Sequence, residues 1–298
     1  MTEKVTEYYV PSQSKWPIIA SISLAILMVG LGNFIQQTSD SGIVTSNTGG
    51  WGKYIFFVGL GLIFYMMYGW WKDTIKESLG GMNSKQLDVS YRMGMMWFIF
   101  SEVMFFAAFF GALFYVRTLV VPWLGGEGSK VSTHDLLWPE FQATWPLIKT
   151  PGGETTQAMG PWGLPLINTL ILITSSVTLT IAHHALIAGH RTKLLAFQSI
   201  TVLLGIIFLV LQVEEYIHAY TEMGLTLGSG IYGSTFFMLT GFHGLHVTIG
   251  TIFLAVMLIR AAKGHLSPEN HFAYEAGAWY WHFVDVVWLF LFVCVYWL

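Results

Sequence analysis

Seven stretches of mostly apolar residues follow one another along the chain, with polar or Gly- and Pro-containing segments between them. A helix needs about 20 mostly apolar residues to cross the hydrocarbon core of a bilayer. Stretches of about that length cover residues 17–35, 54–71, 94–116, 163–187, 194–213, 231–259 and 278–298. The pattern predicts an all-α integral membrane protein with seven transmembrane helices.

The polar segments predict how the chain is organised. Residues 1–16 form a polar N-terminal segment. Residues 17–93 hold the first two spans, expected to form a hairpin, and a charged connection. Residues 94–298 hold the other five spans, expected to form a bundle. Within them, the long segment 117–162 is rich in Trp and Pro, and we expect it to be an ordered cap on the outer interface.

Composition supports a lipid-covered surface. The chain of 298 residues is 54% hydrophobic and only 10% charged, whereas a soluble domain carries about 25% charged residues. The single cysteine, Cys294, excludes an internal disulfide or a cluster of thiolates, and no CxxCH motif is present for covalent haem attachment.

The distribution of lysine and arginine predicts the orientation. With the N-terminus in the cytoplasm, ten of the 14 basic residues lie on the cytoplasmic side. The outer side then holds only Lys53, Arg117, Lys130 and Lys149. Cytoplasmic loops carry the excess of positive charge in membrane proteins. We therefore expect a cytoplasmic N-terminus and a C-terminus on the outer side.

Four sequence blocks carry a family resemblance. They are WWKDTIKE at 70–77, RMGMMWFIFSEVMFFAAFF at 92–110, STFFMLTGFHGLHVTIG at 234–250 and AGAWYWHFVDVVWLFLFVCVYWL at 276–298. In order and spacing these blocks resemble cytochrome c oxidase subunit III of the haem-copper oxidases. The likeness covers roughly residues 50–298, and WYWHFVDVVW is its most specific part.

The resemblance implies a non-catalytic core subunit of a proton-pumping oxidase in the aerobic respiratory chain of a bacterial inner membrane. It implies that the first two helices are separated from the other five by a cleft that holds phospholipids. This chain would carry no haem or copper; those cofactors belong to its partners, subunit I in direct contact and subunit II in the same complex. It would stabilise subunit I, protect it from inactivation during turnover, and support proton uptake and oxygen access.

Glu102 is an acidic residue expected deep in the membrane. It stands eight residues after Gly94, about 12 Å along a helix. An ionised carboxylate is costly there, so we expect Glu102 to be protonated or hydrogen-bonded. It matches the family's buried glutamate in the third span. Two interpretations remain open and overlap: a lipid-contacting or proton-linked acid, and a structural hydrogen bond to a neighbouring helix.

Two further pairs of polar residues lie at helical spacing. His243 and His246 share one helix face, as do His282 and Asp285. Histidines with an aspartate could bind a metal, but an interhelical hydrogen-bond network fits better, with Asp285 within reach of His243 or His246. No metal site is predicted. Glu214 and Glu215 are expected to face headgroups or loop residues.

A group of residues at the cytoplasmic rim is the candidate lipid site. Tryptophan rings favour the headgroup level, and basic side chains attract lipid phosphate. With Glu102, the candidates are Trp70, Trp71, Glu77, Arg260, Lys263 and His265. Ordinary interfacial anchoring is the alternative. Where the family often has a histidine pair after the second span, this chain has Met82 and Asn83, which puts that histidine's lipid contact in question.

Three other functions are alternatives to this one. A secondary transporter using Glu102 and Asp285 predicts inverted repeats and broken helices, and the sequence shows no convincing repeat. A membrane haem enzyme predicts facing axial histidines and a Soret band of its own. A quinol oxidase subunit III is the nearest alternative, but that branch usually lacks the first two helices, which are present here.

Overall fold

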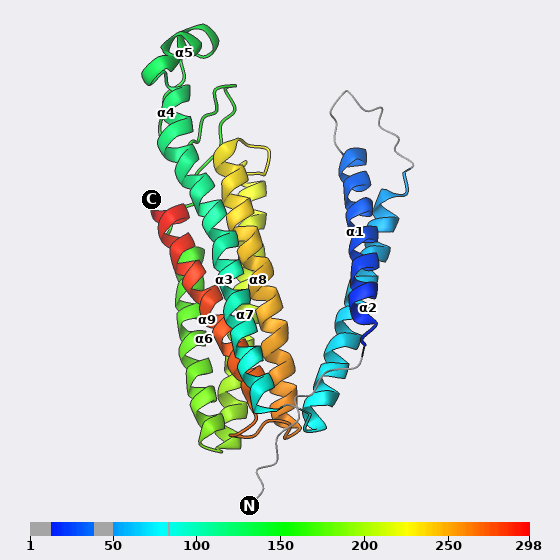
Figure 1. Cartoon of the computed structure of the whole chain (residues 1–298). Helices are drawn as coiled ribbons and strands as arrows, with labels where there is room; N and C mark the ends of the chain where they lie inside the picture. The colour runs from blue at the N-terminus through cyan, green and yellow to red at the C-terminus, as the bar shows by residue number, and fades with distance from the viewer. Residues whose placement is uncertain (1–12, 39–49, 83) are drawn as a thin grey trace, which may run out of the picture. The chain divides into compact units, whose positions relative to one another are not determined.

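The computed structural model describes residues 13–38, 50–82 and 84–298, and their regular structure is helical. Seven helices are long and apolar enough to cross a membrane, which confirms the predicted fold class. These helices are α1 (Trp16–Thr38), α2 (Gly52–Leu79), α3 (Lys85–Tyr115), α6 (Leu164–Ile187), α7 (Arg191–Thr221), α8 (Ile231–Ala262) and α9 (Phe272–Leu291), shown in Figure 1.

Several helices extend beyond the apolar stretches that predicted them. α2 continues to Leu79 and α3 already begins at Lys85, so most of the predicted charged connection is helical. α7 reaches Thr221, which places Glu214 and Glu215 inside a helix. Hydropathy indicates only the apolar part of a helix, which lies in the lipid. Charged residues have adequate helix propensity, so a helix continues through them until a glycine or proline ends it.

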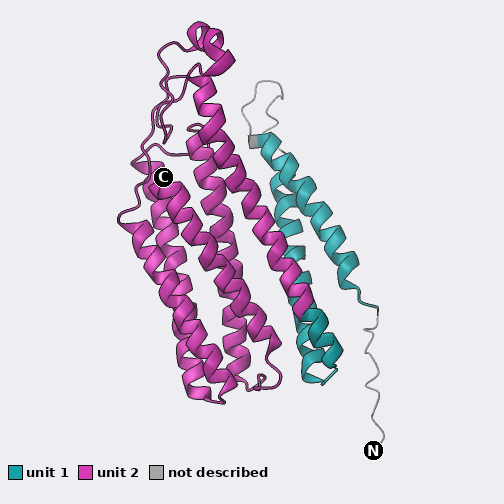
Figure 2. Ribbon diagram, turned by 60° about the vertical axis from the view of Figure 1, so that its left-hand side comes forward, with its two compact units in different colours: residues 1–91 teal, residues 92–298 magenta. Residues whose placement is uncertain are grey.

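The chain divides into two compact units, residues 1–91 and 92–298, coloured separately in Figure 2. In the first unit, α1 and α2 pack closely as a hairpin. A Cβ atom on Gly59 would lie 2.5 Å from the Leu27 Cα atom, so the glycine is required for this approach. At the end of the hairpin near the start of α1, the Trp16 Nε1 atom donates a hydrogen bond to Asp73 Oδ2 at 2.9 Å.

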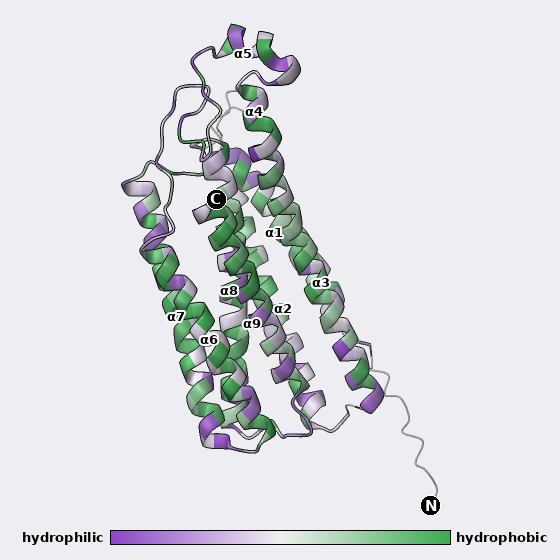
Figure 3. Ribbon diagram, turned by 90° about the vertical axis from the view of Figure 1, so that its left-hand side faces the viewer, coloured by the Kyte–Doolittle hydropathy of each residue, from purple (hydrophilic) through white to green (hydrophobic). Residues whose placement is uncertain are grey.

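The second unit is built around α6, α7, α8 and α9. Its helices are apolar along most of their length and polar mainly at their ends (Figure 3). Two fully buried tryptophans of α9 hold α6 by hydrogen bonds. Trp281 Nε1 donates to Ser175 Oγ, and Trp288 Nε1 donates to Thr169 Oγ1, both at 2.9 Å. Small residues on the facing helices make room for these rings, because a Cβ atom on Gly205 would lie 2.9 Å from Trp281.

The part of α3 in the second unit packs through large rings. Phe105 lies 5.1 Å from Phe242 of α8, and Phe106 lies 6.1 Å from Phe283 of α9, both between ring centroids. Near the start of this part, Arg92 Nη1 forms an ion pair with Glu275 Oε2 at 2.7 Å. Aromatic rings, rather than close backbone contact, therefore hold α3 to the bundle.

The loop that was predicted to begin at Arg117 begins later, after Leu124. The helix continues through a π-helical turn, η1 (Val116–Val120), and α4 (Val121–Leu124), until Gly125 and Gly126 end it. Short helices follow at η2 (Gly128–Lys130) and α5 (Val131–Leu137), and at the C-terminus α9 ends in the π-helical η3 (Phe292–Trp297).

The irregular part of this segment is tied to the bundle. Trp138 Nε1 donates to the Leu124 carbonyl oxygen at 2.9 Å, and the Met159 amide donates to the Tyr232 hydroxyl of α8 at 3.1 Å. The segment is therefore attached to α4 and α8 by hydrogen bonds, while its role as a cap at an outer membrane interface stays a prediction.

Candidate functional site

Glu102 of α3 and His246 of α8 form a hydrogen-bonded pair. Glu102 Oε2 lies 2.8 Å from His246 Nε2, and the two side chains are 21% and 11% exposed. The other ring nitrogen, His246 Nδ1, lies 2.6 Å from the Phe242 carbonyl oxygen. A carbonyl can only accept, so Nδ1 carries a proton. A single proton then lies between Nε2 and Oε2, either on a neutral carboxyl or on an imidazolium facing a carboxylate.

Aromatic rings enclose this pair. The His246 ring lies 5.0 Å from Phe106 and 5.9 Å from Phe105 between centroids, and Tyr280 of α9 stacks beside it at 6.4 Å. An apolar surrounding strengthens a hydrogen bond and penalises separated charges. The arrangement can hold one proton between two helices. It is compatible with both interpretations of Glu102, because the carboxyl group makes a structural hydrogen bond to a neighbouring helix and is still partly exposed.

The other predicted network residues have different partners. His243 Nε2 donates to the Val284 carbonyl oxygen of α9 at 3.2 Å. His282 Nδ1 lies 2.7 Å from Ser176 Oγ of α6 and 3.8 Å from Asp285 Oδ2. His246 reaches Glu102 rather than Asp285. The sequence did not point to Ser176, although serine and threonine recur on the buried face of α6.

The rim candidates fall in both units. In the first unit, Trp70, Trp71 and Glu77 lie near the end of α2, and the Trp70 side chain is exposed. In the second unit, Arg260, Lys263 and His265 lie at the end of α8, where Arg260 is buried and Lys263 is exposed.

Two details bear on lipid contact near these ends. The buried Arg260 Nε atom has no hydrogen-bond partner within the described residues. Met82, at the position where the family often has a histidine, is exposed, while Asn83 lies outside the described residues.

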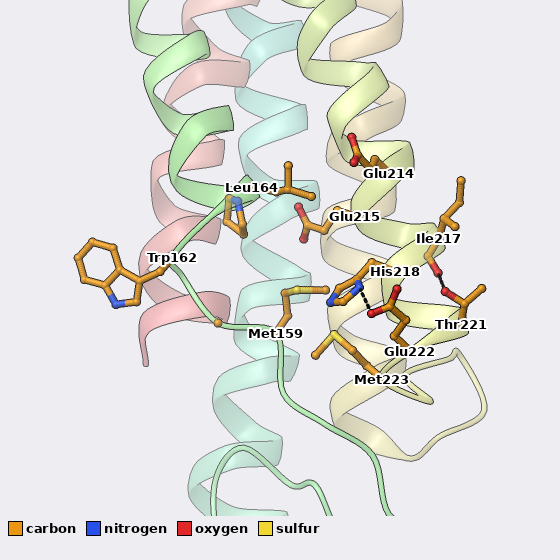
Figure 4. A pocket seen from close by; sticks show the side chains of 12 residues that line it. Met159, Trp162, Leu164, Glu214, Glu215, Ile217, His218, Thr221, Glu222 and Met223 are labelled. Atoms are coloured by element: carbon orange, nitrogen blue, oxygen red, sulfur yellow. Dashed lines mark hydrogen bonds and ion pairs between the residues drawn. The ribbon is translucent and has the colours of Figure 1, made fainter.

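A cavity of about 480 Å³ lies at the end of α7, shown in Figure 4. Glu214, Glu215, His218 and Glu222 contribute to its wall. Glu215 is almost completely buried and accepts a hydrogen bond from the Tyr296 hydroxyl at 2.7 Å. The expectation that Glu215 faces headgroups was therefore wrong, because its side chain points into the bundle, whereas the loop residues Met159, Gly160 and Trp162 do line the same cavity. His218 Nδ1 lies 3.2 Å from Glu222 Oε2, and both side chains are exposed.

Among the described residues, no three or more His, Cys, Asp or Glu side chains are placed to hold a metal ion.

Comparison with known proteins decides the family. The family model for cytochrome c oxidase subunit III matches residues 6–298. The chain belongs to the cytochrome c oxidase subunit III family. Proteins named cytochrome c oxidase subunit 3 are similar over nearly their whole length. That of Prototheca wickerhamii is 41% identical over 97% of this chain and 96% of its own, and that of Phoca vitulina is 40% identical over 100% and 99%.

The block most specific for subunit III forms the centre of the bundle. WYWHFVDVVW occupies residues 279–288 of α9, and its two fully buried tryptophans make the bonds to Ser175 and Thr169 described above. The resemblance identified this block from sequence, but not its partners on α6. Those partners are small hydroxyl residues whose role depends on which helix lies opposite.

Proposed function

We propose that this chain is the non-catalytic subunit III of a proton-pumping cytochrome c oxidase, in direct contact with subunit I and in one complex with subunit II. The observation that carries the proposal is the family match over residues 6–298. The family name itself refers to a multi-subunit oxidase. On this proposal the haem and copper lie in the partner subunits, and this chain stabilises the catalytic subunit and supports its proton uptake and oxygen access.

Lipid binding is the second part of the proposal. Arg260 and Lys263 supply positive charge at one end of α8, and Trp70 supplies an exposed ring at the end of α2. Basic side chains attract lipid phosphate, and tryptophan rings favour the depth of the lipid headgroups. Phospholipids would be held by these residues, and the exposed edge of Glu102 would face an acyl chain.

The membrane that holds the chain is the third part of the proposal. Seven spanning helices make the chain a multi-pass membrane protein. We propose the bacterial inner membrane, with the N-terminus in the cytoplasm and the C-terminus outside, from the distribution of basic residues. Relatives include mitochondrial and plant sequences, so fractionation of the source cell decides which membrane holds the complex.

Co-purification tests the main proposal. The chain, tagged and extracted in a mild detergent, should bring down a haem-copper chain and a copper-binding chain in equal amounts. The complex should show an oxidase absorption spectrum and oxidise cytochrome c. The chain separated from its partners should contain no stoichiometric haem or copper. Haem or copper bound to this chain alone, or purification without either partner, would contradict the proposal.

A further inference from the structure

A groove with a volume of about 560 Å³ lies between α3 and α9, both in the second unit. This volume is typical of a site for a small molecule. The floor of the groove consists of buried apolar side chains from both helices, Phe106, Leu113, Phe283 and Val287. Its two rims are exposed, with Val103 and Phe114 on α3 and Val286 and Phe290 on α9. The groove is therefore an apolar recess between two exposed ridges.

Arg117 is the charged side chain in the wall of this groove. The other side chains that line it are apolar, apart from the thiol of Cys294. Arg117 is partly exposed, and among the described residues no acidic group forms an ion pair with it. Its guanidinium carbon lies 5.8 Å from the centre of the Trp145 ring, a cation–π contact that does not neutralise the charge. The groove thus contains one uncompensated positive charge.

The groove extends over about one leaflet of a bilayer. Phe110 of α3 lies 6.2 Å from Phe290 of α9 between ring centroids, and both helices lead from there toward the same end of the bundle (Figure 1). Arg117 and Cys294 line the groove at this end, three residues before the α9 span ends. Val103 stands fourteen residues before Arg117, about 21 Å along a helix, and half of the hydrocarbon core is about 15 Å thick. The groove therefore runs from the middle of the membrane to the level of the headgroups.

We propose that this groove binds one acyl chain of an anionic phospholipid, whose phosphate pairs with Arg117. An acyl chain is narrow enough to lie between the two ridges. A helix of the same length is about 10 Å across and occupies roughly 1,600 Å³, about three times the volume of the groove. A lipid with a net negative charge is favoured over a zwitterionic one, because the chain itself does not neutralise Arg117.

This site is separate from the lipid part of the proposed function. Arg260 stands near the end of α8, beside the loop that leads into the start of α9, whereas Arg117 lies beside the end of α9. The two arginines therefore belong to opposite leaflets. The inference requires only that the chain spans a membrane.

Photo-cross-linking to lipids tests the proposal on the chain purified in mild detergent with the partners that it retains. The sample is reconstituted into phosphatidylcholine nanodiscs with a trace of a probe, either phosphatidylglycerol or phosphatidylcholine, carrying a diazirine in the same acyl chain. Mass spectrometry compares adducts on the groove residues with adducts around Val210 of α7, which is 60% exposed. The ratio of groove to α7 adducts should be about fivefold higher for the phosphatidylglycerol probe, the factor expected for one basic residue near the headgroups.

Four variants test the two ends of the ligand separately. Arg117→Gln should lower the ratio for phosphatidylglycerol to that for phosphatidylcholine, and Arg117→Lys should retain most of the preference. Lys130→Gln removes an exposed charge beyond the same end of α3 and should leave the ratio unchanged. Ala107→Phe places a ring in the groove and leaves Arg117 intact. It should remove the groove adducts of both probes while the α7 adducts stay.

Three results would overturn the proposal: equal ratios for the two probes, an unchanged preference in Arg117→Gln, or groove adducts that persist in Ala107→Phe. Adducts on α7 without any in the groove would also overturn it, because a partner helix rather than lipid would then cover the groove. Retained α7 adducts and an unchanged circular dichroism spectrum show that each variant is folded.

Discussion

At the scale of single residues, Glu102 gives the sharpest prediction. Glu102→Gln keeps a side chain of the same shape that can bond to His246, but removes the proton shared by the pair. Because the proposed oxidase carries its obligatory proton path in another subunit, we expect near-normal initial oxygen reduction and proton pumping. Any defect should appear in lipid retention or in activity over many turnovers. Stopped-flow pH measurement on reconstituted vesicles, followed by prolonged turnover, measures both.

Glu102→Leu is the matched variant. It removes the hydrogen bond and leaves the enclosed His246 Nε2 atom without its partner, which costs about 1–3 kcal/mol. We expect lower thermal stability of the complex than with Glu102→Gln. If Glu102→Gln abolishes proton pumping in an intact complex, the acid is a required relay, and both the structural and the lipid-facing interpretations are wrong.

Arg260 tests the lipid part of the proposal at the same scale. Its guanidinium group is a cation at the end of α8, and a charge-assisted contact to phosphate is worth about 1–3 kcal/mol. Arg260→Ala should therefore lose tightly held phospholipid, measured by mass spectrometry of lipids extracted from the washed complex. Lys263→Ala, on the exposed surface of the same helix end, should lose less. Unchanged lipid content in Arg260→Ala would speak against a specific site.

At the scale of the helices, alanine substitutions at two glycines distinguish the effect of side-chain packing on stability from that of helix propensity. A Cβ atom on Gly205 of α7 would lie 2.7 Å from Thr251 Oγ1 and 2.9 Å from the Trp281 ring, whereas one on Gly244 of α8 would meet no atom within 4 Å. Gly205→Ala should destabilise by about 1–3 kcal/mol through overpacking. Gly244→Ala should be neutral or stabilising by up to about 1 kcal/mol.

Thermal unfolding in detergent, followed by tryptophan fluorescence, compares these two variants with the wild type. A stable Gly205→Ala would mean that α7, α8 and α9 are less tightly packed around Trp281 than the structure shows.

The helices also indicate what sequence could and could not predict. Hydropathy predicted the seven spans, because each needs an apolar surface about as long as the bilayer is thick. It could not predict that α7 continues to Thr221, since polar residues beyond the apolar stretch extend a helix equally well. The spacing of His282 and Asp285 predicted a shared face. Only the fold brings Ser176 of α6 to His282 and pairs His246 with Glu102, because these contacts depend on how the helices are arranged.

At the scale of the whole molecule, exposed apolar side chains along the spans need lipid or partner helices to cover them, and the family resemblance names the partners that a single chain cannot reveal.

The last prediction concerns what the chain adds to the complex. An oxidase assembled without it should keep near-normal initial oxygen reduction, because the proposed haem and copper sites lie elsewhere. It should then lose activity faster with each turnover, because the lipid and protein surface that supports subunit I is missing. Oxygen consumption followed to complete inactivation, with and without re-addition of this chain, measures the number of turnovers each complex survives. Equal lifetimes would remove the protective role from the proposed function, while a complete loss of initial activity in a complex with intact haem spectra would assign this chain a direct part in the reaction.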